Sequence, residues 1–156
     1  MFELFLSLTV LRKLSFWLVS RPLILLYRFC PLIRPARGSI CILQAGDLFL
    51  MIDRNDGLGL CFPGGSARHD ESDEDAMKRE VFEETGLRVT RAWQLYRYQC
   101  DVFYPHTTTV FKGETAGELT KSWEGTPVWL RLADMKDRIF PPHQRVLLRL
   151  MLDQSM

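Results

Sequence analysis

The chain has 156 residues, of which 47% are hydrophobic and 25% charged, so it is long and apolar enough to bury the core of one domain. These values exclude a disordered chain, a collagen-like repeat and a protein with many membrane spans, and the net charge of +1 argues against a nucleic-acid partner. The charge is unevenly distributed, because residues 1–37 hold six basic and one acidic side chain, a net +5, whereas the rest holds 14 basic and 18 acidic ones, a net −4. This asymmetry predicts a basic extension at 1–37 and a separate domain at 38–156.

The N-terminal extension, residues 1–37, is apolar as well as basic. Its longest uncharged run, Leu4–Leu11, is shorter than the roughly 20 residues that a membrane-spanning helix needs. Pro22 divides the segment into two predicted helices, at 2–20 and 22–30. Two interpretations stay open: a helical pair packed on the body or on a second subunit, and an interfacial segment that lies on an anionic membrane surface.

The compartment is predicted from the cysteines and from the N-terminus. The four cysteines are scattered, without the spacing of a zinc site, and a chain of this size does not need disulfides. No small-residue cleavage site follows the apolar run, which argues against a secretory signal. We therefore expect a cytoplasmic protein with reduced thiols, either free or peripheral at the membrane.

Strands precede, flank and follow one central helix in the body, which predicts a mixed α/β fold. Ser72 and Asp75 form a capping box at the start of that helix, and Gly86 suits the left-handed position after its end. Pro141 and Pro142 introduce a last helix. The predicted strands are 39–43, 48–52, 87–102, 107–111 and 128–132, and the predicted helices of the body are 72–85 and 143–152.

Three glutamates crowd one face of the central helix. Glu80, Glu83 and Glu84 stand at positions i, i+3 and i+4, where like charges destabilise a helix by a few tenths of a kcal/mol per pair. Either solvent or a bound cation must offset this repulsion. The preceding Phe62–Gly65 segment ends in paired glycines, which let the backbone approach a ligand or an ion closely.

The segment from Gly65 to Leu87 resembles the signature of the Nudix hydrolases, G-x5-E-x7-R-E-U-x-E-E-x-G-U, in which U is a bulky aliphatic residue. The resemblance covers about residues 38–152 and implies the Nudix α/β/α sandwich with a mixed β-sheet, here preceded by a hydrophobic, basic helical extension. All nine defined positions of the signature are filled, by Gly65, Glu71, Arg79, Glu80, Val81, Glu83, Glu84, Gly86 and Leu87.

The resemblance also implies a MutT-like pyrophosphohydrolase that depends on Mg²⁺, with Mn²⁺ as a substitute. Such an enzyme cleaves the diphosphate bond of a nucleoside diphosphate linked to another moiety, so its partner is a small molecule and not a nucleic acid. Arg79 would orient the glutamates, and Glu71 would have a supporting role, with metal contact as the alternative. The implied metal ligands are the carbonyl of Gly64 and the carboxylates of Glu80, Glu83 and Glu84.

The identity of the general base stays open in the sequence. Members of the family use either a glutamate of the signature, here Glu83 or Glu84, or a glutamate of a later loop. Glu124 falls at the loop position, in a stretch that resembles the Glu-Gly…Trp segment of MutT-like members. Glu114 and Glu118 are alternatives in the same region, and an ordinary turn glutamate is another interpretation of Glu124.

Candidate substrate-binding residues depart from the MutT-like pattern. Arg54 is the only arginine of a loop that carries several in many relatives, and Lys112 is a second candidate for phosphate contact. Gln144 or His143 stands where MutT-like enzymes have a base-reading Asn, so selectivity for 8-oxoguanine is not implied. Aromatic side chains at strand spacing could stack on a base or fill the core; these are Trp93, Tyr96, Tyr98 and Tyr104.

Two further functions are compatible with the same residues. One is a non-catalytic module that senses a nucleotide, which the complete set of signature carboxylates disfavours. The other is a membrane-associated hydrolase of a lipid-linked diphosphate, in which residues 1–37 contact the bilayer or mediate self-association. The particular substrate, the number of metal ions and the oligomeric state are not determined by these patterns.

Overall fold

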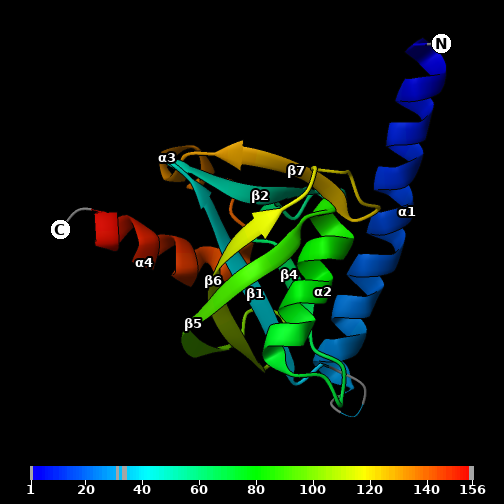
Figure 1. The fold of residues 1–156 in the computed structure, drawn as a ribbon. Coiled ribbons are helices and arrows are strands. Elements are labelled where there is room, and N and C mark those ends of the chain that lie inside the picture. The colour runs from blue at the N-terminus through cyan, green and yellow to red at the C-terminus, as the bar shows by residue number, and fades with distance from the viewer. Residues whose placement is uncertain (1, 31, 33–34, 155–156) are drawn as a thin grey trace.

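The structure is a computed structural model that describes residues 2–30, 32 and 35–154, and for residues 2–9 and 12 it describes the backbone alone. A long N-terminal helix is followed by seven strands, with one helix between β4 and β5 and two more after the last strand (Figure 1). In chain order the elements are α1 (Phe2–Phe29), β1 (Arg37–Ala45), β2 (Leu48–Arg54), β3 (Leu60–Cys61), β4 (Gly64–Ser66), α2 (Asp73–Thr85), β5 (Arg88–Cys100), β6 (His106–Ala116), β7 (Gly125–Leu130), α3 (Leu132–Met135), the 3₁₀ turn η1 (Pro141–His143) and α4 (Gln144–Gln154).

The strands form one mixed sheet in the order β3-β2-β1-β6-β5, with β4 also paired to β1 and β7 to β2. β1 and β6 run parallel, and the other pairs are antiparallel. The predicted mixed α/β fold is therefore confirmed. Sequence analysis identified the five longer strands, but it missed β3 and β4, which are too short to show an alternating pattern.

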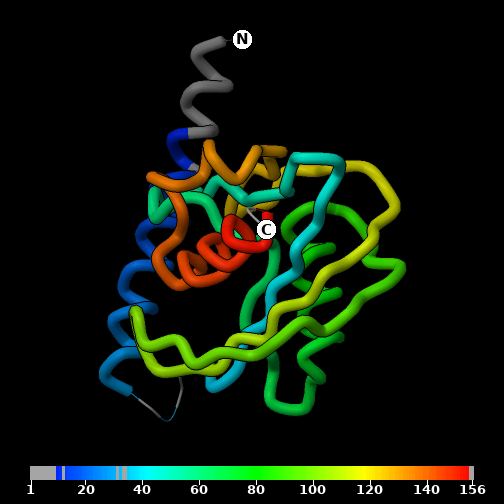
Figure 2. The backbone as a smooth tube through the Cα atoms, turned by 90° about the vertical axis from the view of Figure 1, so that its left-hand side faces the viewer, coloured from blue at the N-terminus to red at the C-terminus, as the bar shows by residue number. Residues whose placement is uncertain are grey.

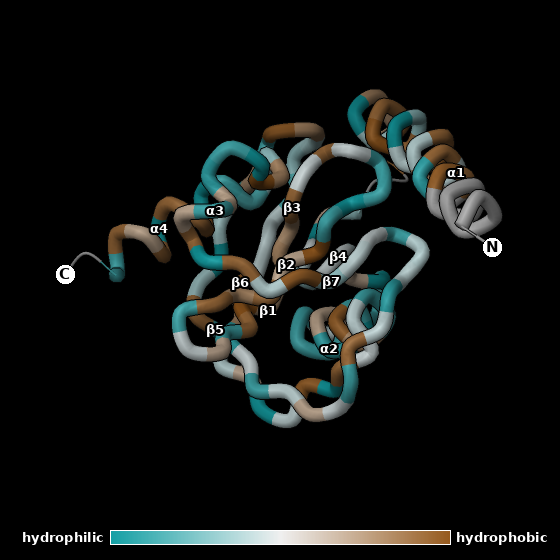
Figure 3. The backbone as a smooth tube through the Cα atoms, turned by 90° about the horizontal axis from the view of Figure 1, so that it is seen from above, coloured by the Kyte–Doolittle hydropathy of each residue, from teal (hydrophilic) through white to brown (hydrophobic). Residues whose placement is uncertain are grey.

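Both faces of the central strands are covered, and β1 shows why. Ile40 and Ile42 pack into a core with α3 and α4, whereas Cys41 and Leu43 pack into a second core with α2. Successive side chains of a strand point to opposite faces, so a continuous apolar run requires cover on both sides. Figure 3 shows α2 and α3 on opposite sides of the sheet.

The predicted helix α2 begins and ends where its capping residues indicate. The Ser72 hydroxyl accepts a hydrogen bond from the Asp75 N–H at 3.0 Å. Gly86 adopts the left-handed conformation, with φ 76°, and its N–H donates to the Phe82 carbonyl. These local signals place the glutamate face of α2 against β4.

The prediction that Pro22 divides the N-terminal segment was wrong, because one helix runs from Phe2 to Phe29 with Pro22 inside it. Proline removes a single hydrogen bond from the helical ladder. Contacts with the body hold the helix on both sides of this position, since Phe16 lies against Trp123 at 4.9 Å and Tyr27 against Tyr104 at 5.3 Å between ring centres.

α1 lies along one side of the body (Figure 2). Besides the ring contacts, the Trp123 indole N–H donates to the Ser15 hydroxyl at 3.2 Å, and Arg21 donates to the Asp56 carbonyl at 3.5 Å. In the described part of the chain, no helix is both long and apolar enough to cross a bilayer. All four cysteines are free, and Cys41, Cys61 and Cys100 are buried, as the sequence predicts.

Candidate active site

The three glutamates of α2 have different surroundings. Glu84 is only 3% exposed and accepts a hydrogen bond from the Gly64 N–H at 2.8 Å. The Glu80 side chain is largely buried, whereas that of Glu83 is 53% exposed. The three carboxylates on this face of α2 therefore differ in exposure, from the buried Glu84 beside the glycine loop to Glu83 in solvent.

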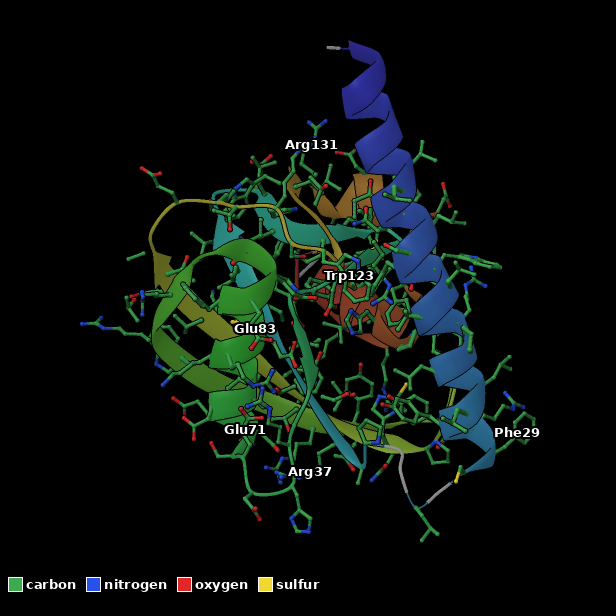
Figure 4. The ribbon with its side chains drawn as sticks, turned by 90° about the vertical axis from the view of Figure 1, so that its right-hand side faces the viewer. Phe29, Arg37, Glu71, Glu83, Trp123 and Arg131 are labelled. Carbon is green, nitrogen blue, oxygen red and sulfur yellow. The ribbon has the colours of Figure 1, made fainter. Side chains whose placement is uncertain are left out.

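Arg79 connects the carboxylates of this site. Its Nε and Nη2 each donate to one oxygen of Glu71 at 2.8 Å, and Nη1 donates to Glu80 at 2.7 Å and to Glu83 at 3.2 Å. This bidentate contact lowers the pKa of Glu71 to about 2. Glu71 thus holds Arg79, while Arg79 holds two of the three glutamates (Figure 4 labels Glu71 and Glu83).

The paired glycines bring β4 against these carboxylates. A Cβ on Gly64, whose φ is +145°, would lie 2.2 Å from the Ser39 carbonyl oxygen of the paired strand β1. A Cβ on Gly65 would lie 2.5 Å from the carboxylate carbon of Glu80. Only a glycine pair allows the strand to approach both β1 and α2 so closely.

Glu124 lies in the same electrostatic environment as the α2 carboxylates. Burial raises the pKa of Glu80, Glu84 and Glu124, and mutual repulsion involving the Glu124 charge raises the pKa of the other two further. Attraction to Arg54 acts in the opposite direction on Glu84 and Glu124. The pKa of all three carboxyl groups stays raised although Arg79 and Arg54 act against the shift, so a further hard cation would stabilise their charged form.

The donor set fits Mg²⁺ in its chemistry, since it consists of carboxylates beside the backbone of Gly64. Among the described residues, however, no group of three or more His, Cys, Asp or Glu side chains is gathered at ligand distances. These carboxylates have other hydrogen-bond partners in the structure, since Arg79 donates to Glu80 and Glu83 and the Gly64 N–H donates to Glu84.

Of the three later glutamates, Glu124 is the one whose charge raises the pKa of Glu80 and Glu84. The Asn55 N–H donates to the Glu124 carbonyl at 2.8 Å, and the Asn55 side chain donates to the Trp123 carbonyl, so the segment is tied to the loop after β2. Glu114 and Glu118 are exposed, and Glu114 pairs with Arg91 at 3.9 Å. In Figure 4, Trp123 lies between α1 and the site.

Arg54 is the last residue of β2, and its side chain is only 15% exposed. Its guanidinium forms two hydrogen bonds to the Asp56 carboxylate, at 3.0 and 2.5 Å, and lies over the rings of Phe140 at 4.5 Å and Phe16 at 5.4 Å. Burial alone would lower the pKa of Arg54, but the contacts with Asp56 outweigh it and raise the pKa above its ordinary value. A permanent cation is thereby held near the carboxylates of the site.

A cavity of about 180 Å³ adjoins the glycine loop. Its wall combines the polar groups of Arg54, Gly64 and Gly65 with Tyr104 and His143, and α1 contributes Ile24. Sequence analysis missed Ile24, Phe103 and Phe140 in this wall. No local signal marks them, because they meet only in the folded chain.

The structure separates the two candidates for base recognition. His143 lines the cavity, and its Nδ1 accepts a hydrogen bond from the Phe62 N–H at 3.1 Å; burial lowers its pKa to about 3, so the ring is neutral. Gln144 is exposed and borders another surface depression, with Tyr98 and Arg145.

The other candidates for substrate contact lie in different surroundings. Tyr104 lines the cavity, whereas Lys112 and Trp93 are exposed. Tyr98 is buried and its hydroxyl donates to the Pro142 carbonyl, and Tyr96 lies beside Arg149.

Comparison with known proteins identifies the family of the chain. The NUDIX domain family matches residues 32–151. The chain belongs to the Nudix family. As a member of this family it is a Nudix-type pyrophosphohydrolase. It carries all nine signature residues between Gly65 and Leu87. No curated protein matches the chain significantly.

Solved Nudix structures share the fold. The MutT Nudix hydrolase from Burkholderia pseudomallei is 21% identical, with a TM-score of 0.66 over 74% of this chain and 97% of that one. The ORF135 protein of E. coli is 21% identical, with a TM-score of 0.66 over 76% and 90%. A MutT protein from Bacillus halodurans is 25% identical, with a TM-score of 0.61 over 71% and 78%. The predicted Nudix fold is confirmed.

Proposed function

We propose that this Nudix protein is a Mg²⁺-dependent hydrolase that cleaves the diphosphate bond of a nucleotide or nucleotide derivative. The observation that supports the proposal is the buried Glu84 carboxylate on the Gly64 N–H, whose pKa is raised by burial and by the neighbouring charges of Glu124 and Glu80. Gly64, Glu80, Glu83 and Glu84 would hold the metal. A bound Mg²⁺ would neutralise phosphate oxygens and lower the pKa of the attacking water.

The residues of this chain then have separate tasks. Arg79, anchored by Glu71, keeps Glu80 and Glu83 oriented. Glu124 accepts the proton of the attacking water, since burial raises its pKa towards the working pH, where a general base is most effective. Arg54, held by Asp56, provides positive charge for a phosphate group in the adjoining cavity.

The cavity favours a substrate with a flat apolar part beside its phosphates. Tyr104, Phe140 and the neutral His143 line it together with Arg54. Aromatic rings stack on a nucleobase, and the neutral imidazole, whose Nδ1 accepts from Phe62, has its Nε2–H left to donate to the edge of the base. We also propose a reducing cytoplasmic setting, supported by the free state of the four cysteines.

The test is the release of phosphate and pyrophosphate with Mg²⁺ over a panel of diphosphates: nucleoside triphosphates, ADP-ribose, sugar nucleotides, dinucleoside polyphosphates and a prenyl diphosphate. We expect turnover on one class, and a loss of at least about 100-fold in Glu84→Gln, which keeps the size and the acceptor for Gly64. The matched control is Glu114→Gln, an exposed glutamate outside the site, which should keep full activity. Turnover by a folded Glu84→Gln protein would refute the assigned metal site.

Glu124 has its own test on the substrate so identified. Glu124→Gln should lower kcat about 100-fold or more with little change in KM, because a general base acts in the transition state and not in substrate binding. The pH profile of the remaining activity should lose its acidic limb. An unchanged kcat would assign the base to a glutamate of α2.

A further inference from the structure

One side of α1 is apolar and has no partner within the described part of the chain. The large side chains of this side are between 52% and 77% exposed. They recur at helical spacing over about 27 Å, so they form one stripe along the helix. We call this stripe the outer face of α1; it consists of Leu11, Leu14, Leu18, Leu25 and Phe29.

The opposite side of α1 is already occupied by the body. Phe16 is buried against Trp123, Tyr27 contacts Tyr104, and Ile24 lines the cavity. The helix is therefore fixed in its rotation about its own axis, and the outer face points away from the protein. Figure 4 shows Phe29 on the side of α1 turned away from the sheet. A contiguous exposed apolar stripe of this length marks an interaction site.

The charges along α1 distinguish between two possible partners of the outer face, a second copy of the chain and a lipid surface. Lys13, Arg21 and Arg28 are exposed, and Glu3 is the only acidic residue within residues 1–37, which carry a net +5. A second copy that packs the same face against this one would bring its own arginines to Arg21 and Arg28, and the described side chains of α1 include no carboxylate to pair with them. An anionic lipid surface supplies both the apolar phase and the negative charge.

We propose that the outer face of α1 binds the surface of an anionic bilayer, with the helix lying in the plane of the interface. Leucines and Phe29 enter the boundary between headgroups and acyl chains, and Arg21 and Arg28, each three residues after a leucine of the stripe and therefore on its flank, meet lipid phosphates. Because Ile24 lies on the other side of the same helix, docking places the cavity about one helix diameter, ~10 Å, from the headgroups.

The test uses the full chain and vesicles, without substrate. We expect co-sedimentation with vesicles of phosphatidylcholine and phosphatidylglycerol at 0.1 M salt, and at least tenfold weaker binding both to pure phosphatidylcholine vesicles and at 0.5 M salt. Leu18→Glu with Leu25→Glu should abolish binding. Reversing Arg28 to Glu should weaken it by at least about fivefold.

A matched control distinguishes docking through the outer face of α1 from nonspecific adsorption to vesicles. Leu148→Glu with Leu152→Glu places two acidic residues on exposed leucines of α4 and should leave vesicle binding unchanged. Thermal unfolding of each variant checks that the body is intact, since none of these side chains belongs to the core.

Three results would overturn the proposal: no binding by the folded wild-type chain, equal binding to neutral and anionic vesicles, or an equal loss in the α4 variant. A dimer in sedimentation velocity that the Leu18/Leu25 variant dissolves, without vesicle binding, would assign the outer face to a second copy. Vesicle binding needs no turnover, so a protein that binds lipid but hydrolyses nothing would refute the proposed function and retain this inference.

Discussion

Gly64 and Gly65 are adjacent in the chain, yet an added methyl group would meet different obstacles at the two positions. At Gly64 it would collide with backbone, the Ser39 carbonyl oxygen at 2.2 Å, in a conformation with φ +145°. At Gly65 it would meet the carboxylate of Glu80, the far end of a flexible side chain. Backbone cannot move aside without breaking the β1–β4 pairing, whereas a carboxylate can rotate away.

Gly65→Ala should therefore impair activity more than stability. We expect at least a tenfold loss of kcat, because Glu80 would leave the proposed metal site, with a change in unfolding free energy below about 1 kcal/mol. Gly64→Ala should instead destabilise the fold by more than about 2 kcal/mol through strain and clash. Chemical denaturation and the phosphate-release assay measure both quantities. Equal destabilisation by the two variants would contradict this separation of roles.

At the scale of elements, α1 connects to both loops that carry predicted site residues. Phe16 lies between the ring of Trp123, next to Glu124, and the guanidinium of Arg54. These contacts join residues far apart in sequence through one side chain of the extension. The helix is thus part of the support of the site, as well as an N-terminal appendage of the body.

Phe16→Ala should loosen both loops. Removing a buried phenyl ring should lower the unfolding free energy by about 3 kcal/mol. It should also speed amide hydrogen exchange in 54–59 and 121–125. The matched control is Trp17→Ala, since Trp17 is the next residue of the helix and is exposed; its effect should stay within about 0.5 kcal/mol. Unaltered exchange in both loops would show that the body positions them without α1.

At the scale of the whole molecule, stability should depend on the protonation of His143. The pKa of this residue is about 3 in the folded state and 6.5 in an exposed chain, because burial disfavours the charged ring. The unfolded state therefore binds more protons between pH 3 and 6.5, and stability falls as the pH is lowered through this range. Lowering the pH from 7 to 5 should remove about 2 kcal/mol through His143 alone.

His143→Asn isolates this contribution, since an amide oxygen can still accept from Phe62 and cannot titrate. The unfolding free energy of the variant should change less between pH 7 and 5 than that of the wild type, by about 2 kcal/mol. The fully exposed His69, replaced in the same way, should leave the difference unchanged. A parallel pH dependence of wild type and His143→Asn would show that the imidazole becomes protonated in the folded protein.

Much of the site is predictable from the sequence because its rules are local. Helical spacing alone places Arg79, Glu80, Glu83 and Glu84 on one side of α2, and capping residues set both ends of the helix. The neighbourhood of Glu124 follows from resemblance and not from spacing. It depends on hydrogen bonds to Asn55, 69 positions earlier in the chain.

Sequence by itself determined the mixed α/β body, the helix α2 and the carboxylate set, because each follows from periodicity, capping or motif spacing within about 25 residues. Tertiary structure alone decided the continuity of α1 through Pro22, the burial of Arg54 and the opposite directions of His143 and Gln144. Each of these depends on which surfaces meet after folding. The residues that make such long-range contacts lie far apart in the chain, so no short stretch of sequence reveals them. The free energy of this packing also outweighs local preferences, such as the tendency of proline to interrupt a helix.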